Sequence, residues 1–512
     1  MTTLLNVWRR LRWILAALLL LVGAWAIQRW VRVPRAGRVL ILGASVEGLD
    51  PTVGRGLTRL VMDGLEVGSG ATVLGVVDQV PPEALRDMET RDLLFRLSGR
   101  REGDALALEL LWTTAGEERN HRPWRKVALP AAPPDQVLAR LMRSWPLPRV
   151  SYDVRALAPR DPGRFWGLLQ AMSVTDDRAA LGFIQASRDL AAAEPKCAAA
   201  WTNLGEQLYR SLWISTGEAG SLPQNQALEA FDQALGLVPG YPRAAFLRGM
   251  METDVGNQRE ALRGLVLARR RRPWVPDLYS GLAYAGRTSG LLDGALAAYS
   301  VRSELIKPFP APSGWFAENT LLYTGRWDAF EQSLQAGAGS ETDPVFLFYR
   351  GYLRLLRKDP EGALGFFVKG AENRETSMPF RELCEVYAVA LEGRPDQALA
   401  LLKTFDRSRG SLRIPDGELT FKIAEAYAYL DRQDLALDSA GRAFAQGFGC
   451  TRWYETSPIF APARQHPRWT ALHQHLQERQ ALLEKAFDPT DFKPRPVFNR
   501  NSWMRALPGN SP

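Results

Sequence analysis

The chain has 512 residues, of which 46% are apolar and 23% charged, the balance of a globular protein with about three domains of roughly 150 residues. Its three cysteines, Cys197, Cys384 and Cys450, are far apart and odd in number, which argues against a disulfide framework or a CxxC metal site. The formal net charge of +8 is spread along the chain, so we expect no nucleic-acid partner.

Residues 1–34 contain an apolar segment flanked by arginines. The run Trp13–Ile27 is too short for a hydrocarbon core of about 30 Å, but a helix over residues 11–31 reaches about that length. Tryptophans stand at both ends, where interfacial aromatics belong: Trp8, Trp13, Trp25 and Trp30. We predict a membrane anchor at residues 11–31, single-pass in a bacterial inner membrane, with most of the chain in the periplasm. The alternatives are a signal peptide cleaved after Ala24–Ala26 and a buried core helix.

Residues 38–150 have the pattern of a small α/β domain. The expected elements are a strand at 39–42, a helix at 53–66, a strand at 71–77, a helix at 81–88, strands at 93–100, 105–113 and 124–129, and a helix at 134–145. Three consecutive strands indicate a mixed sheet instead of a doubly wound nucleotide-binding fold. Gly43 could open a nucleotide-binding fingerprint, but Ser45 occupies the place of its next glycine. We therefore expect no cofactor, and a turn at Gly43.

Three stretches of this region resemble the TolB N-terminal-like domain of bacterial signalling proteins. They are VLILGASVEG, VGRGLTRLVMDGLE and LLFRLSGRREGDALALELLWTTAGE. The family's Pro-Phe-x-Asn after the first strand is absent, and Gly43-Ala44-Ser45 stands there instead. In that family the domain often links a membrane helix to tetratricopeptide repeats, so the resemblance implies a non-catalytic accessory role.

Residues 162–480 repeat with a 34-residue period. The recurring positions are Ala227, Ala261 and Ala295; Phe231, Leu265 and Tyr299; Pro239 and Pro273; and Gly256 and Gly290. With the stretch Trp201–Gly205, they resemble the tetratricopeptide pattern, in which small residues let paired helices approach and a proline ends the second helix. The resemblance implies an α-solenoid of about seven repeats with a C-terminal capping helix.

Such solenoids bind proteins or peptides along a concave surface formed by the first helix of each pair. The repeat frame predicts eight residues on this surface: Asn203, Glu206, Arg210, Arg243, Phe246, Met250, Tyr284 and Arg287. The pair Asn203 and Arg243 is similar to repeat grooves that hold a C-terminal carboxylate. For any single residue, an ordinary solvated helix face is the alternative. As a set they predict a partner groove, in which Arg243→Glu with Arg287→Glu weakens capture.

The remaining motifs favour no catalytic or metal site. The run Arg269–Arg272 is expected to end a helix, where cations suit the helix dipole, instead of binding phosphate. His473 and His475 are two residues apart and point to different sides of a helix, so we expect no metal. Residues 488–512 are rich in proline and asparagine and are expected to be disordered.

Together these features predict a mainly α protein: one transmembrane helix, a small α/β domain and a tetratricopeptide α-solenoid. The predicted function is a membrane-anchored, non-catalytic scaffold or adaptor that binds proteins, in bacterial envelope signalling. One alternative is an exported assembly or secretion factor released by signal-peptide cleavage. The other is a nucleotide-dependent enzyme that uses the α/β domain.

Overall fold

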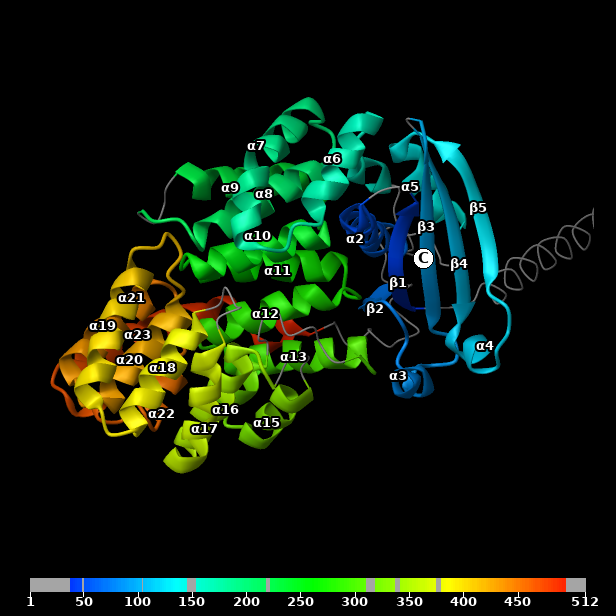
Figure 1. The fold of residues 1–512 in the computed structure, drawn as a ribbon. Coiled ribbons are helices and arrows are strands. Elements are labelled where there is room, and N and C mark those ends of the chain that lie inside the picture. Colours follow the sequence, from blue (N-terminus) through cyan, green and yellow to red (C-terminus); the bar gives the residue numbers. More distant parts are fainter. Residues whose placement is uncertain are drawn as a thin grey trace, which may run out of the picture.

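The structure is a computed structural model that describes residues 37–47, 50–103, 105–144, 153–217, 222–309, 318–336, 341–373 and 379–493. The expected anchor at residues 11–31 lies outside these ranges. Within them, no helix has both the length and the apolar character needed to cross a bilayer. The described chain is mainly helical, with a five-stranded sheet at one end (Figure 1).

Apart from the short helix α4, the N-terminal part has the predicted order of elements. They are β1 (Arg38–Glu47), α2 (Pro51–Gly68), β2 (Thr72–Val77), α3 (Pro82–Asp87), β3 (Leu93–Glu102), β4 (Ala105–Thr114), α4 (Ala115–Arg119), β5 (Arg125–Ala132) and α5 (Pro134–Ser144). The sheet order is β2-β1-β3-β4-β5. β1 is parallel to β2 and β3, whereas β3, β4 and β5 are antiparallel, so the prediction of a mixed sheet is confirmed.

One local prediction in this region is wrong. β1 does not turn at Gly43; it continues to Glu47, and its register against β3 shifts between Leu42 and Ala44, as in a β-bulge. The ten-residue partner β3 extends the ladder beyond what the apolar run in β1 indicates. After β4, the short helix α4 begins at a reciprocal capping box formed by Thr114 and Glu117; the sequence pattern did not predict this helix.

Eight antiparallel helix pairs follow among the described residues. They are α6 (Pro162–Met172) with α7 (Asp177–Ala193), α8 (Ala198–Leu212) with α9 (Leu222–Leu237), α10 (Pro242–Asp254) with α11 (Gln258–Arg271), α12 (Pro276–Thr288) with α13 (Leu292–Ile306), α14 (Asn319–Tyr323) with α15 (Trp327–Ala336), α16 (Pro344–Leu356) with α17 (Pro360–Glu372), α18 (Phe380–Leu391) with α19 (Pro395–Gly410), and α20 (Gly417–Tyr429) with α21 (Gln433–Ala445). We call the first helix of each pair the A helix and the second the B helix.

The repeat positions pack as their pattern predicts. A Cβ added at Gly205 of α8 would lie 2.7 Å from the ring of Phe231 in α9, so only glycine lets the two helices approach this closely. Gly256 and Gly290 have positive φ values of 90° and 84° and form the turns between A and B helices. The 34-residue period therefore reflects the close contacts between paired helices and the glycine turns that join them.

The last helices bring the solenoid back onto its own beginning. The loop after α8 bridges the loop before α20 through Thr216 and Leu412. The Gly449 amide donates to the Thr288 carbonyl at 2.7 Å. After α22 (Thr451–Thr456), α23 (Trp469–Ala486) buries Leu476 and Leu483, as expected of a capping helix. The array therefore encloses its inner face.

The beginning of the C-terminal tail is docked, which corrects the expected disorder from residue 488 onward. The short helix η4 (Pro489–Phe492) follows α23, and Phe492 is 1% exposed. Its ring fills the space beside Gly286 and Gly294, where an added Cβ would lie within 2.9 Å of it. Arg270 pairs with Asp491 at 2.6 Å. The rest of the tail lies outside the described residues.

The α/β part and the first helix pairs share one hydrophobic core. Helix α2 lies between the sheet and the first pairs, in contact with α6 and α10 (Figure 1). One apolar cluster runs from Val39 in β1 to Ala298 in α13. The Trp274 indole donates to the Glu66 carbonyl at 3.2 Å and the Thr72 hydroxyl donates to the Trp274 carbonyl at 3.0 Å. These contacts hold α2 and β2 against the repeats.

Candidate ligand-binding site

A cavity of about 650 Å³ lies inside the closed array, on the side of the A helices. Seven A helices contribute to it: α8, α10, α12, α14, α16, α18 and α20. The lining comprises Thr175, Asp176, Asp177, Tyr209, Arg210, Trp213, Leu247, Met250, Asp254, Tyr284, Arg287, Asn319, Tyr349, Phe380, Asp416, Glu418, Leu419 and Lys422. Because the array curves back on itself, residues more than 200 positions apart meet here.

Four of the eight residues predicted for the partner groove line this cavity: Arg210, Met250, Tyr284 and Arg287. They come from three successive A helices, as the repeat frame indicates. Met250 is 2% exposed and Tyr284 9% exposed, so both are largely buried in the wall of the cavity.

Helix α2 covers Glu206 and Arg243. The Glu206 carboxylate, 1% exposed, pairs with Arg243 and, at 2.9 Å, with Arg59 of α2. Arg243 also faces Asp63 of α2 at 3.5 Å, and the Tyr241 hydroxyl donates to Asp63 at 2.5 Å. Burial alone would raise the pKa of Glu206, but Arg59 and Arg243 outweigh it and lower that pKa below its ordinary value. This network joins the α/β part to the repeats.

Asn203 and Phe246, the remaining two predicted residues, are also engaged within the chain. The Asn203 amide donates to the Ser187 hydroxyl at 3.0 Å, and Asn203 is fully buried. Phe246 is 7% exposed and belongs to the first hydrophobic core. The structure therefore does not bring Asn203 and Arg243 together at an open carboxylate-binding surface.

Asp254 of α10 is the most perturbed acid in the cavity. It accepts hydrogen bonds from the hydroxyls of Tyr209 and Tyr284, the second at 2.5 Å. Burial, together with the nearby charges of Asp416 and Glu418, raises the pKa of Asp254 to about 8. Without a ligand, the carboxyl is therefore largely protonated at neutral pH.

Asp416 stands at the opposite side of the array, immediately before α20. Its φ of 65° lies in the left-handed region, which costs energy for a residue other than glycine. The side chain caps α20 by accepting from the amides of Glu418 and Leu419 at 2.9 and 3.3 Å. Burial and the neighbouring Glu418 raise the pKa of Asp416 to about 6. The chain thus holds an acid in a strained position that faces the cavity.

Each basic residue of the lining has an acidic partner within the protein. Arg210 contacts Asp177 at 3.2 Å, and Arg287 contacts Glu418 at 2.7 Å. The Lys422 ammonium lies 3.0 Å from a Glu425 oxygen, and Glu425 is fully buried. Burial would raise the pKa of Glu418, but Arg287 outweighs it and lowers that pKa.

Asn319 of α14 lines the cavity and is bonded to two neighbouring residues. Its amide nitrogen donates to the Tyr349 hydroxyl at 2.7 Å and to Glu418 at 2.9 Å. Because an ionised carboxylate only accepts, the amide nitrogen must face Glu418, and the oxygen points elsewhere. This Oδ1 atom is buried and accepts no hydrogen bond.

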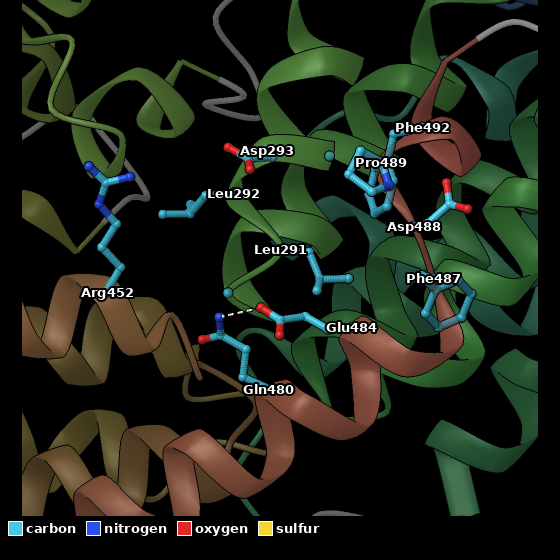
Figure 2. A pocket seen from close by; sticks show the side chains of 12 residues that line it. Leu291, Leu292, Asp293, Arg452, Gln480, Glu484, Phe487, Asp488, Pro489 and Phe492 are labelled. Carbon is cyan, nitrogen blue, oxygen red and sulfur yellow. Dashed lines mark hydrogen bonds between the residues drawn. The ribbon is translucent and has the colours of Figure 1, made fainter.

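A second cavity, of about 370 Å³, lies where α23 and η4 close over the start of α13 (Figure 2). In Figure 2, Phe487, Pro489 and Phe492 wall one side, and Arg452 approaches from α22 on the other. The Gln480 amide donates to Glu484 at 2.7 Å across its floor. This cavity belongs to the closure of the array and combines no comparable set of buried polar groups.

The structure also locates the other motifs. The run Arg269–Arg272 forms the last turn and C-cap of α11, as predicted. His473 faces Glu455 at 2.6 Å. Across the described ranges, no three histidine, cysteine or acidic side chains are grouped as a metal site would require.

Sequence reasoning missed Asp254, Asn319, Asp416 and Glu418. A signal for Asp254 exists, because it follows the predicted Met250 by four residues and so shares its helix face. The other three follow irregular connections at which the 34-residue frame is lost. Only the closure of the array brings them opposite the first repeats.

Comparisons with known proteins name no family. No protein-family profile matches the chain, and no curated protein matches it. Among solved structures, one similar chain comes from "Crystal structure of APC/C hetero-tetramer Cut9-Hcn1". It is 14% identical with a TM-score of 0.38, and the match covers 61% of this chain and 55% of that chain.

Proposed function

We propose that this protein is a non-catalytic scaffold that binds a segment of a partner protein in the cavity enclosed by its A helices. The observation that carries the proposal is the cavity itself, about 650 Å³ in volume, to which seven A helices contribute. This volume lies within the range of about 300–1,000 Å³ typical of small-molecule sites, so it has room for a few side chains of a partner segment. Helical repeats present such inner faces to protein and peptide ligands.

Site-specific photocrosslinking in the native host tests this proposal. p-Benzoylphenylalanine would replace Trp213, which lines the cavity, and, as the control, Leu267, which is 54% exposed on the B helix α11. We expect partner adducts from position 213 in clear excess over position 267, identified by mass spectrometry. Adducts of equal yield at both positions, or at 267 only, would contradict binding in the cavity.

The proposal for cellular location rests on the sequence alone. Residues 11–31 would anchor the protein in a bacterial inner membrane and leave the repeats in the periplasm, in keeping with the TolB-like resemblance of residues 38–150 and a role in envelope signalling. Protease added to spheroplasts should then degrade residues 40–512. N-terminal sequencing of the mature protein separates an anchor from cleavage after Ala26.

A further inference from the structure

The lining of the cavity has more acidic than basic residues. It contains five carboxylates, Asp176, Asp177, Asp254, Asp416 and Glu418, against the three bases Arg210, Arg287 and Lys422. Those bases already pair with Asp177, Glu418 and Glu425. In the part of the chain that the structure describes, no basic nitrogen lies within 4.0 Å of Asp254 or Asp416. The bases that could bind an anion in the cavity are therefore already paired, whereas Asp254 and Asp416 have no basic partner and could bind a cation.

The walls between these acids are aromatic. Tyr209, Trp213, Tyr284, Tyr349 and Phe380 line the same space. Aromatic faces attract ammonium and guanidinium groups, and the chain already shows this contact where the Arg287 guanidinium lies 4.7 Å from the Tyr284 ring centroid. Such walls suit the aliphatic stem of a basic side chain as well as its charged end.

We infer that the cavity binds the ammonium or guanidinium end of a lysine or arginine side chain presented by the partner protein. This inference rests on the proposed function and specifies its ligand. The bridge between Thr216 and Leu412 closes the array, so the site accepts a side chain or chain end more readily than a long helix laid along a groove. The cation would lie between Asp254 and Asp416.

The direct test measures binding of charge-matched peptides to the full chain in detergent micelles by isothermal titration calorimetry. The probes are acetyl-Ala-Arg-Ala-amide, acetyl-Ala-Lys-Ala-amide, acetyl-Ala-Glu-Ala-amide and n-butylguanidinium. We expect both basic peptides to bind at least about tenfold more tightly than the acidic one. Binding of n-butylguanidinium without binding of the basic peptides would overturn the peptide source and indicate a free amine. Equal or tighter binding of the acidic peptide would overturn the cation site.

The variants Asp254→Asn and Asp416→Asn locate the cation. Both keep the size of the side chain, and asparagine still caps α20 at position 416. Each variant should weaken the binding of the basic peptides about tenfold. Asp396→Asn, in the exposed first turn of α19, should leave their affinity unchanged. Circular dichroism melting confirms that the variants are folded. Unchanged affinity in both cavity variants would refute the assignment.

Proton release provides a readout on the unmodified protein. Asp254 faces Tyr209 of α8, Tyr284 and Arg287 of α12, and Asp416 with Glu418 at α20. Because the pKa of Asp254 is raised to about 8, a bound cation should expel its proton at pH 7. Calorimetry in buffers of different ionisation enthalpy should detect this release, and its absence would count against a cation beside Asp254.

The two proposals can fail separately. If the Asp254→Asn, Asp416→Asn double variant still forms the photocrosslinked adducts, the proposed scaffold function is supported and the cation site is refuted. If the basic peptides bind but position 213 yields no protein adducts, the cation site is supported and the proposed scaffold function is refuted.

Discussion

The Glu206 carboxylate has three arginines around it and almost no solvent. Arg59 and Arg210 lie 2.9 and 3.2 Å from it, and Arg243 is in direct contact. A buried charge without its partner is far less stable than an exposed one, because the protein interior solvates ions poorly. The network is therefore a constraint that holds α2 in position over the A helices, whatever it contributes to net stability.

Removing this charge should destabilise the fold strongly. Glu206→Gln leaves Arg243 and Arg59 without their main counterion, so we expect the free energy of unfolding to fall by about 3–5 kcal/mol. The matched control is Glu260→Gln, which breaks the exposed 2.6 Å pair with Arg263 and should cost less than about 1 kcal/mol. Urea unfolding followed by circular dichroism measures both. A loss at position 206 no larger than at position 260 would show that the network carries no structural constraint.

Asp254 gives the stability a distinct pH dependence. Its pKa is about 8 in the folded chain against 3.8 when unperturbed, so between these values the folded state keeps a proton that the unfolded state has lost. Wild-type stability should therefore fall as pH rises from about 4 to 8, by on the order of 1 kcal/mol per pH unit. Asp254→Asn removes this component. The free energy of unfolding of the variant should therefore increase relative to that of the wild type as the pH rises to 8, and the difference should be constant above pH 8. Urea unfolding at pH 5, 7 and 9 measures the difference, and a constant difference would contradict the assignment.

Individual site residues differ in how far the sequence predicts them. The repeat frame places Arg210, Met250, Tyr284 and Arg287 on the inner face, and the structure has them at the cavity. It cannot show that α2, about 150 residues earlier in the chain, covers Glu206 and Arg243. Burial and pairing of this kind depend on contacts between distant segments, which a local period does not contain.

At the scale of elements, the local sequence pattern predicts the helix pairs and the order of the strands. It does not predict where these elements end or which other segments they pack against. The turns at Gly256 and Gly290 recur because only glycine adopts their positive φ without strain. By contrast, the bulge at Gly43 depends on the length of β3, and η4 is ordered because Phe492 finds a gap beside Gly286 and Gly294. In sequence, β3 is distant from Gly43, and Gly286 and Gly294 are distant from Phe492.

Phe492 should control the attachment of the C-terminal segment. Phe492→Ala removes a ring that is 1% exposed and should cost about 3–5 kcal/mol of local stability, which is enough to release η4 from α13. Hydrogen exchange should then quicken over residues 487–493 and the end of α23, while the A helices stay protected. Leu482→Ala, on a side chain of α23 that is 71% exposed, serves as the control and should change little. Loss of protection throughout the array would mean that the segment is part of the global fold.

At the scale of the whole molecule, the cores do not follow the boundary between the α/β part and the repeats. The first cluster contains strand residues, α2 and the pairs up to α13, whereas the second spans residues from α13 to α23. Residues beyond α13 reach the first cluster through Ile414, Leu483 and Phe492. A unit that shares its core with its neighbour cannot unfold alone without exposing that neighbour's apolar surface.

The sheet and the first helix pairs should therefore lose stability together. Leu65→Ala in α2 deletes a fully buried side chain of the first cluster and should cost about 2–5 kcal/mol. Native-state hydrogen exchange should show faster opening in the sheet and equally in α6, α8 and α10. The matched variant Leu402→Ala, fully buried in α19 and in the second cluster, should act on α16–α21 and spare the sheet. If Leu65→Ala affected the sheet alone, the α/β part would be an independent domain, and α2 would be only a surface contact of the repeats. A joint response would instead make α2 part of the solenoid's core.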